Sequence, residues 1–231
     1  MKAEKLAILT QLSNELLADG GQSFRDQLDR KMGAAVSWNL DYKFLTGSGA
    51  GQPSGILADA ALVVVAKETV PAQPAATVLL PNVLKMYARL YAGGHKNAVW
   101  ICNYNVVPQL YNLQSKVLNQ AGTEWVGGSQ APYFSVGANG AMTLLGLPVV
   151  PTEKLPTLGQ QGDIVLADLS QYVIGLRADI RVDASNGPGF STDSTYVRCI
   201  VRVNGCGSWN APLTPKTGDT LSWVVALAIR S

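Results

Sequence analysis

One long amphipathic helix, ending in a glycine-rich loop, restricts the fold of this chain more than any other pattern. From Gln22 to about Phe44, apolar residues recur every three or four positions, as they do on one face of an α-helix. These residues are Phe24, Leu28, Met32, Ala35, Trp38, Tyr42 and Leu45. At about 1.5 Å per residue, such a helix is a rod of roughly 33 Å. The glycine-rich segment 47–55 cannot continue it.

The clearest strand pattern covers residues 174–183. Apolar residues alternate there with Gly175 and with charged residues whose sign also alternates, so one face of the strand is apolar and the other is a charged ladder. The ladder consists of Arg177, Asp179, Arg181 and Asp183. Segment 196–203 has a similar pattern after the turn region 187–189, which predicts an antiparallel pair.

Shorter patterns complete an α+β chain. Strands are expected at 4–12, 60–66, 98–102, 163–167 and 221–229, and a helical turn capped by Ser13 follows the first of them. A second helix is expected from Pro81 to Gly93, and a third from Asn105 through Leu118. The glycine-rich segment 127–140 is expected to be a flexible loop.

Charged residues are scarce in this sequence. They make up 15% of the 231 residues, against about 25% in ordinary soluble domains, while 47% are hydrophobic. The net charge of +2 creates no strong field for nucleic acid or an anionic membrane, and the longest apolar run, 60–66, is too short to span a bilayer. We therefore expect no specific nucleic-acid partner and no membrane partner. Such a chain either buries an unusual share of itself or covers its surface with its own copies.

The residues needed for catalysis are not grouped in any familiar way. The one histidine, His95, lies beside two glycines and has no evident nucleophile or carboxylate partner in the sequence. The three cysteines, Cys102, Cys199 and Cys206, lack metal-ligand spacing and are expected to be structural thiols. The glycine-rich loop lacks both the dinucleotide fingerprint and a Gly-Lys-Ser/Thr sequence. The chain is thus expected to be no enzyme and to hold no cofactor or metal.

Five segments in order carry a resemblance to a known family. They are Leu-Ser-Asn-Glu-Leu-Leu at 12–17, Phe-Leu-Thr-Gly-Ser-Gly-Ala-Gly-Gln-Pro-Ser-Gly-Ile-Leu at 44–57, Trp-Ile-Cys-Asn at 100–103, Leu-Gly-Leu-Pro-Val-Val-Pro at 145–151, and the strand 174–183. Together they resemble the major capsid proteins of tailed bacteriophages, which have the Hong Kong 97-type fold. The resemblance covers essentially the whole chain.

The resemblance implies an α+β fold of two domains. Residues 1–55 and 172–208 would form a peripheral-like domain, in which residues about 22–46 are a spine helix packed with an antiparallel sheet. Residues 56–171 and 209–231 would form a compact α+β axial-like domain with its tip at 127–140. Subunit contacts are expected at the charged ladder and at the glycines of that tip, namely Arg177, Asp179, Arg181, Asp183, Gly127, Gly128 and Gly137.

The implied function is that of a structural shell subunit that acts by self-association. Its partners would be its own copies, in pentamers, hexamers or smaller oligomers, and also scaffolding or portal proteins. It would be located in the virion capsid, or in the host cytoplasm when expressed from a prophage.

Family members carry an N-terminal arm and an extended loop before the segment that begins near Lys5, so the chain is expected to be truncated. Some relatives crosslink a lysine of that loop to an asparagine on a peripheral strand, and because the loop is missing from this sequence, the resemblance assigns no crosslink residues here.

Three alternatives stay open at this point. A bacterial nanocompartment (encapsulin-like) shell protein shares the fold. An enzyme with an unrecognised site would need a deep polar pocket that gathers His95 and carboxylates. The charged ladder itself could be an ordinary solvated strand face.

Overall fold

The computed structural model describes residues 2–70, 72–119, 121, 125–129 and 133–230. The chain divides into two compact units, one of residues 1–55 and 174–206 and the other of residues 56–173 and 207–231. In the described part of the chain, no helix has both the length and the apolar character that a membrane crossing needs.

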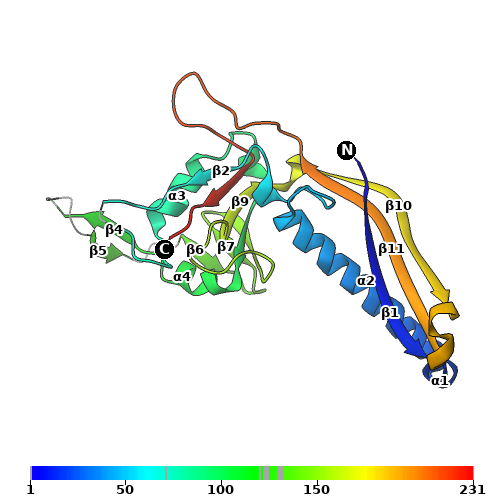
Figure 1. Cartoon of the computed structure of the whole chain (residues 1–231). Coiled ribbons are helices and arrows are strands. Elements are labelled where there is room, and N and C mark those ends of the chain that lie inside the picture. The colour runs from blue at the N-terminus through cyan, green and yellow to red at the C-terminus, as the bar shows by residue number, and fades with distance from the viewer. Residues whose placement is uncertain (1, 71, 120, 122–124, 130–132, 231) are drawn as a thin grey trace. The chain divides into compact units, whose positions relative to one another are not determined.

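The first unit combines a long helix with a three-stranded sheet in the order β1-β11-β10 (Figure 1). Its elements are β1 (Glu4–Ser13), α1 (Asn14–Asp19), α2 (Gly21–Thr46), β10 (Tyr172–Ser185) and β11 (Ser194–Gly207), with a 3₁₀ helix (Gly187–Thr192) between β10 and β11. β1 and β11 are antiparallel along the whole of β1, from Glu4 opposite Val203 to Ser13 opposite Ser194. The expected helical turn is α1, where the Ser13 hydroxyl accepts a hydrogen bond from the Leu16 amide.

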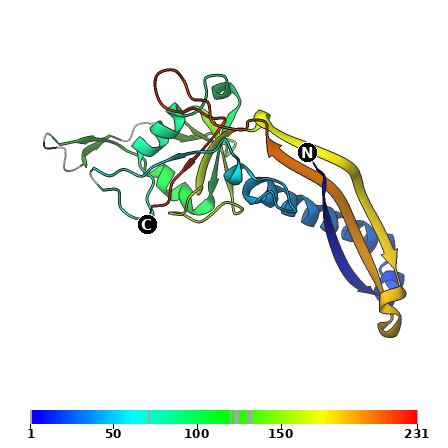
Figure 2. The ribbon, with the colours of Figure 1, turned by 45° about the horizontal axis from the view of Figure 1, so that its top comes forward.

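α2 runs along the sheet formed by β1 and β11 (Figure 2). The core of this unit lies between them. Alternate residues of β11 point toward the helix, as the pleat requires, and Leu6, Ile8 and Leu12 of β1 join them. The buried members of this cluster are Met32, Val36, Val197, Cys199 and Val201.

The apolar pattern of the sequence includes Trp38 and Tyr42, but these aromatic residues do not lie on the buried face of α2. Leu28, Met32, Val36 and Leu40, spaced by four, pack on the sheet. Trp38 and Tyr42 are exposed instead, with their rings stacked at 5.7 Å. Both stripes have helical spacing, so periodicity could not decide between them; the sheet covers the aliphatic one.

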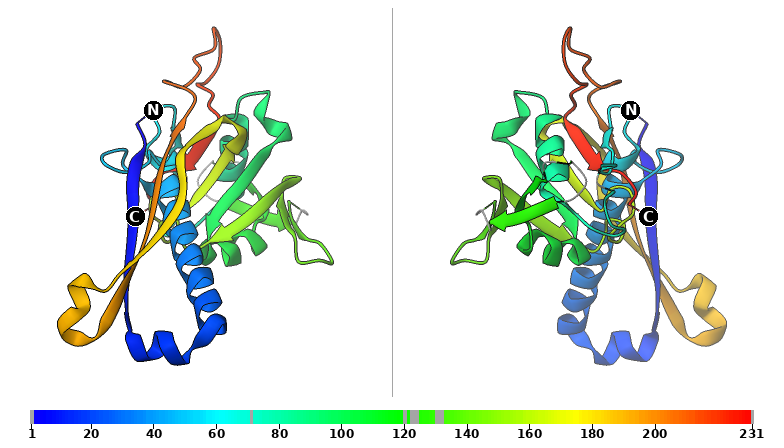
Figure 3. Two further views of the ribbon diagram at one scale, coloured as in Figure 1. Left: turned by 90° about the vertical axis from the view of Figure 1, so that its right-hand side faces the viewer. Right: turned by 90° about the vertical axis from the view of Figure 1, so that its left-hand side faces the viewer.

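The second unit contains a seven-stranded sheet in the order β2-β12-β9-β3-β8-β7-β6 and a two-stranded sheet of β4 and β5 (Figure 3). Its strands are β2 (Val63–Val65), β3 (Ala98–Asn103), β4 (Ser115–Leu118), β5 (Trp125–Ser129), β6 (Phe134–Val136), β7 (Met142–Leu144), β8 (Leu147–Thr152), β9 (Ile164–Asp168) and β12 (Val224–Leu227). Its helices are α3 (Leu80–Ala88) and α4 (Val107–Tyr111), with 3₁₀ helices at Ile56–Ala58, Gly94–Lys96, Tyr104–Val106 and Leu169–Gln171.

The larger core belongs to this unit and surrounds the central strands. Strands β3 and β9, which pair antiparallel, are almost wholly buried, and the Trp100 indole donates to the Leu144 carbonyl at 3.1 Å. Fully buried strands produce continuous apolar runs, which explains why the sequence identified them.

Two predicted helices are shorter than expected. α3 ends at Ala88. The backbone beyond it bonds to a distant segment instead, since the Tyr91 amide donates to the Ser222 carbonyl at 3.0 Å. The third helix is α4 alone, and the rest of the predicted helix is β4, paired antiparallel with β5. The residue that caps this region is Asn103, whose side chain accepts from the Asn105 amide at 3.0 Å, and not Asn105 as predicted.

Candidate subunit-contact surface

The charged ladder lies on β10, at one edge of the three-stranded sheet (Figure 1). Asp183 accepts hydrogen bonds from two guanidinium groups, that of Arg198 on β11 at 2.9 Å and that of Arg181 on its own strand at 2.8 Å. These two hydrogen bonds, with that from Arg198 the larger cause, lower the pKa of Asp183. The contact with Arg198 links β10 to its neighbour β11 on this face of the sheet.

The other half of the ladder lacks such contacts. Within the described residues, neither Arg177 nor Asp179 makes an ion pair, and both side chains are exposed on a strand with no neighbour beyond it. The sequence therefore identified the ladder correctly as a charged strand face. The ladder presents two charges, those of Arg177 and Asp179, that no ion pair among the described residues neutralises.

The opposite face of β10 is apolar and uncovered. Arg198 points away from the core, so Asp183 and the ladder lie on the side of the sheet that faces away from α2. The alternate residues Ile174, Leu176, Ile180 and Val182 then lie on the same side as the core of β11. They are nevertheless 54%, 58%, 53% and 50% exposed, because α2 packs over β1 and β11 only.

In its described part, the glycine-rich segment 127–140 is not the single flexible loop that the sequence suggested, and residues 130–132 lie outside the described residues. Gly127 and Gly128 lie in β5, which pairs with β4. Gly137 closes a tight turn between β6 and β7, where its amide donates to the Ala141 carbonyl at 2.8 Å. Backbone pairing thus orders segments that glycine content alone marks as loop.

The loop after α2 is held by its own backbone. The Gly55 amide donates to the Gly47 carbonyl at 2.8 Å, and a Cβ on Gly55 would lie 2.5 Å from the Gly47 nitrogen. Gly49 and Gly51 have φ angles of +78° and +67°, which L-residues rarely adopt. These glycines allow the tight turn of this loop, so their presence is explained without a phosphate-binding role.

The residues that could take part in catalysis or metal binding are dispersed over the fold. His95 lies in the 3₁₀ helix Gly94–Lys96 with its ring 4.5 Å from that of Tyr87, and it lines neither the cavity beside Pro53 nor the one beside Pro81. Among the described residues, no three His, Cys, Asp or Glu side chains are grouped to hold a metal. Burial raises the pKa of Cys102 to about 12, so this thiol is not nucleophilic at neutral pH.

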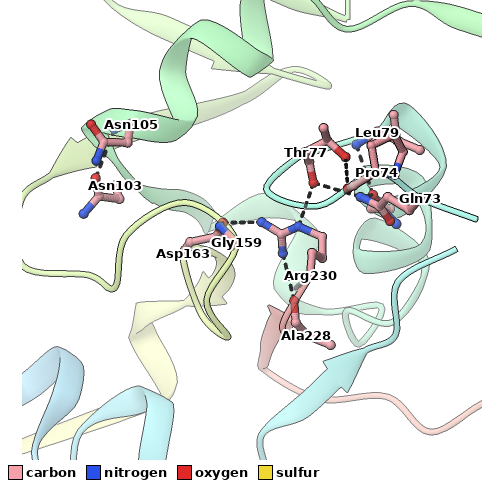
Figure 4. Close-up of polar contacts among 11 residues, drawn as sticks. Gln73, Pro74, Thr77, Leu79, Asn103, Asn105, Gly159, Asp163, Ala228 and Arg230 are labelled. Carbon is pink, nitrogen blue, oxygen red and sulfur yellow. Dashed lines mark hydrogen bonds and ion pairs between the residues drawn. The ribbon is translucent and has the colours of Figure 1, made fainter.

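Sequence reasoning missed one polar cluster entirely, the one around Arg230 (Figure 4). Its side chain is fully buried, forms an ion pair with Asp163, and donates to the carbonyls of Thr77 at 2.6 Å and Ala228 at 2.9 Å. The Gly159 amide donates to the same carboxylate at 2.9 Å. Each guanidinium nitrogen of Arg230 has a partner within the fold, whereas Oδ1 of Asp163 has none among the described residues, and the cluster ties the segment after β12 to the rest of the unit.

Burial raises the pKa of Asp163, while the Arg230 guanidinium opposes that shift. A lone arginine and a lone aspartate 67 residues apart carry no signal of pairing in the sequence.

Solved capsid structures share this fold. The capsid of an empty GTA particle superposes with a TM-score of 0.69 at 19% identity, over 99% of this chain and 74% of that one. A protein of Gordonia phage Cozz gives 0.63 at 12% identity, over 99% and 70%. The SrpI encapsulin of Synechococcus elongatus PCC 7942 gives 0.61 at 12% identity, over 98% and 73%. The α+β capsid fold expected from the sequence is therefore confirmed.

Comparison by sequence identifies the family. No curated protein matches the chain. The sequence model of the phage capsid family, however, matches residues 1–206, which is most of its length. This chain belongs to the phage capsid family.

Proposed function

We propose that this protein is a structural subunit of a phage or prophage capsid shell and that it acts by self-association and not by catalysis. The observation that carries the proposal is the match of the phage capsid family over residues 1–206. A chain with 15% charged residues and large apolar side chains exposed along β10 has a surface suited to contact with its own copies.

The contact surface we propose is the outer edge of β10 with the charged ladder Arg177, Asp179, Arg181 and Asp183. Alternating charges across an interface fix the register of neighbours and reject wrong pairings, even where they add little affinity. Two of the four, Arg177 and Asp179, have no ion-pair partner among the described residues. A neighbouring subunit would neutralise them.

The two units would have different tasks in the shell. Residues 1–55 and 172–208 would be the peripheral-like domain, and residues 56–171 and 209–231 the axial-like domain. Contacts around the shell's symmetry axes would involve Gly127, Gly128 and Gly137, now as parts of β5 and of the β6–β7 turn.

Subunits of this kind would gather into pentamers and hexamers, or into smaller oligomers. The GTA capsid that shares the fold is described with C5 symmetry. Scaffolding and portal proteins are further partners we propose. The assembled protein would be in the virion capsid, and in the host cytoplasm when expressed from a prophage.

A nanocompartment shell is the second candidate. The SrpI encapsulin complex supports it through a TM-score of 0.61, but at 12% identity this likeness concerns the fold alone. The family match favours the phage capsid. A nanocompartment subunit would enclose a protein cargo when co-expressed with its genomic neighbours, whereas a capsid subunit would not.

The test is assembly of the full chain with a reversed ladder. We expect the wild-type protein to form oligomers or shells, seen by analytical ultracentrifugation and negative-stain microscopy, and Arg177→Glu/Arg181→Glu to shift it to smaller species. Arg25→Glu/Arg30→Glu, at exposed positions on α2, is the matched control with the same change in net charge. A wild-type protein that stays monomeric at high concentration would contradict the shell function. Unchanged assembly of the Arg177/Arg181 variant would contradict only the role of the ladder.

A further inference from the structure

We propose that two copies of this chain pair edge to edge through β10, antiparallel, about a two-fold axis at Ile180, so that two three-stranded sheets join into one. The inference rests on the proposed function, because it names the partner of the same surface as a second copy. It goes further in fixing the symmetry, direction and register of the contact.

The open edge of β10 is the first requirement for this pairing. In the order β1-β11-β10, the strand has a neighbour on one side only, and its 14 residues leave a row of backbone donors and acceptors without strand partners on the other. An added strand satisfies such groups by ordinary ladder hydrogen bonds. A long edge strand of this kind is a template for pairing unless something blocks it, and β10 contains no proline.

The charges of β10 are complementary to themselves in one register. In antiparallel pairing centred on residue 180, the residue numbers of two facing positions add up to 360. Arg177 then faces Asp183 of the second copy, and Asp179 faces Arg181. All four charges meet an opposite charge, and the two-fold axis repeats each pair.

No neighbouring arrangement does as well. When the pairing is centred on residue 178 or 182, only one kind of Arg–Asp pair forms, and the other two charged residues face uncharged positions. Centring it on 179 sets Arg177 opposite Arg181. A parallel in-register pairing sets every charge opposite its own copy, and like charges directly opposite each other destabilise a sheet.

The apolar face supports the same register. On the side of the sheet away from the ladder, Ile180 meets Ile180 of the second copy, and Ala178 meets Val182. Side chains directly opposite on antiparallel strands have Cβ atoms about 4.5–5.5 Å apart, so they touch. Ile180 and Val182, now 53% and 50% exposed, would each gain an apolar neighbour.

The other edge of the sheet lacks this complementarity. β1 has two charged residues, Glu4 and Lys5, which are adjacent in sequence and therefore point to opposite faces. No antiparallel self-pairing of β1 builds a charge ladder. β10 is the edge whose sequence specifies its own copy as partner.

Cysteine crosslinking tests the register directly. In a Cys206→Ser background, Ile180→Cys should give a disulfide or short bis-maleimide dimer of the full chain, because the two-fold axis brings the two residues together. The native Cys102 and Cys199 are buried and do not interfere. Ile174→Cys is the matched control at equal exposure, 54% against 53%. Its two copies would lie about 40 Å apart at about 3.4 Å per residue, so it should not crosslink.

A charge swap tests the pairing independently of crosslinking. Asp179→Arg alone sets Arg opposite Arg181 twice, and Arg181→Asp alone sets Asp opposite Asp179 twice. Each single variant should dimerise about tenfold more weakly or worse. The double variant Asp179→Arg/Arg181→Asp restores both pairs, so it should dimerise within about threefold of wild type, yet it should not pair with wild-type chains.

The outcomes separate this inference from the proposed function. Dimers at Ile180→Cys together with rescue by the swap support the two-fold pairing. Wild-type oligomers with no Ile180→Cys crosslink, or with no rescue, overturn the pairing and leave the shell function standing. Equal crosslinking at Ile174→Cys overturns the register. A wild-type chain that does not associate at all overturns both.

Discussion

Arg230 and Asp163 form an ion pair in which neither side chain reaches solvent. The two residues lie on different segments, and the guanidinium also donates to two backbone carbonyls, so the pair closes several loops of the second unit at once (Figure 4). The backbone of Arg230 adds to this closure, since its carbonyl accepts from Ala76 at 2.9 Å and its amide donates to Gly159 at 2.8 Å.

Removing one partner of this pair should be costly. Arg230→Met leaves the Asp163 carboxylate buried without its charge partner, and we expect the free energy of unfolding to fall by about 3–5 kcal/mol. Arg25→Met, at an exposed position of α2, should change it by about 0.5 kcal/mol or less. Chemical denaturation followed by circular dichroism measures both, and equal effects would show that the buried pair contributes nothing special.

The two stripes of α2 can be compared on the same helix. Met32 is 5% exposed and packs on β11, so Met32→Ala should cost about 2–5 kcal/mol of stability. Tyr42 stacks on Trp38 at the surface, with the Lys43 ammonium 5.4 Å from its ring centroid, and Tyr42→Ala should cost about 1 kcal/mol or less. Thermal unfolding of the two variants in parallel checks this order. The reverse order would return the aromatic stripe to the core, as the sequence pattern suggested.

Two glycines of the first unit should respond to alanine in opposite directions. A Cβ on Gly55 would lie 2.5 Å from the Gly47 nitrogen, so Gly55→Ala should destabilise by about 1–3 kcal/mol. Gly33, in the middle of α2, has open space around its Cβ position, and Gly33→Ala should stabilise by up to about 1 kcal/mol through helix propensity. Denaturant midpoints with unchanged m-values would report both effects. A harmless Gly55→Ala would mean that the loop can rearrange.

Acid should weaken the contact between β10 and β11. The pKa of Asp183 lies below its ordinary value of 3.8 in the folded chain, since Arg198 and then Arg181 hydrogen-bond the carboxylate. A lowered folded pKa adds stability above the unfolded value, and this contribution is lost as the pH falls through the folded pKa. Asp183→Asn should therefore lower the unfolding midpoint at pH 7 but change it little near pH 2–3.

The control for this pH dependence is Asp29→Asn. Asp29 is exposed on α2 and makes no ion pair within the described residues, so its substitution should change the unfolding midpoint little at pH 7. If the unfolding midpoints of wild type and Asp183→Asn differed by the same amount from pH 7 to pH 2, the stabilising role of the Asp183 carboxylate would be contradicted.

Much of the fold could be predicted because it depends on local regularities. The strict alternation at 174–183 is a strand in any context that pairs its backbone, and the buried strands β3 and β9 are continuous apolar runs. The long helix begins at Gly21 and ends at Thr46, within two residues of its expected limits, because the glycine-rich loop cannot extend it. The resemblance to capsid proteins, carried by five short segments, agrees with the family found over residues 1–206.

What the sequence could not supply were the contacts between distant segments. β4 has a helical spacing of apolar residues but pairs with β5, since an available partner strand outweighs a weak helical pattern. For the same reason, Gly127 and Gly128 lie in a strand and not in a loop.

The sequence by itself determined the family, the long helix and the charged ladder, because each depends on patterns within short segments of the chain. Only the tertiary structure decided which stripe of α2 is buried, that Arg230 pairs with Asp163, and that β10 is an edge strand with one apolar face left open. These depend on which surfaces meet when the chain folds. The ladder identifies β10 as a strand, but only its place at the edge of the sheet makes it a surface for another copy.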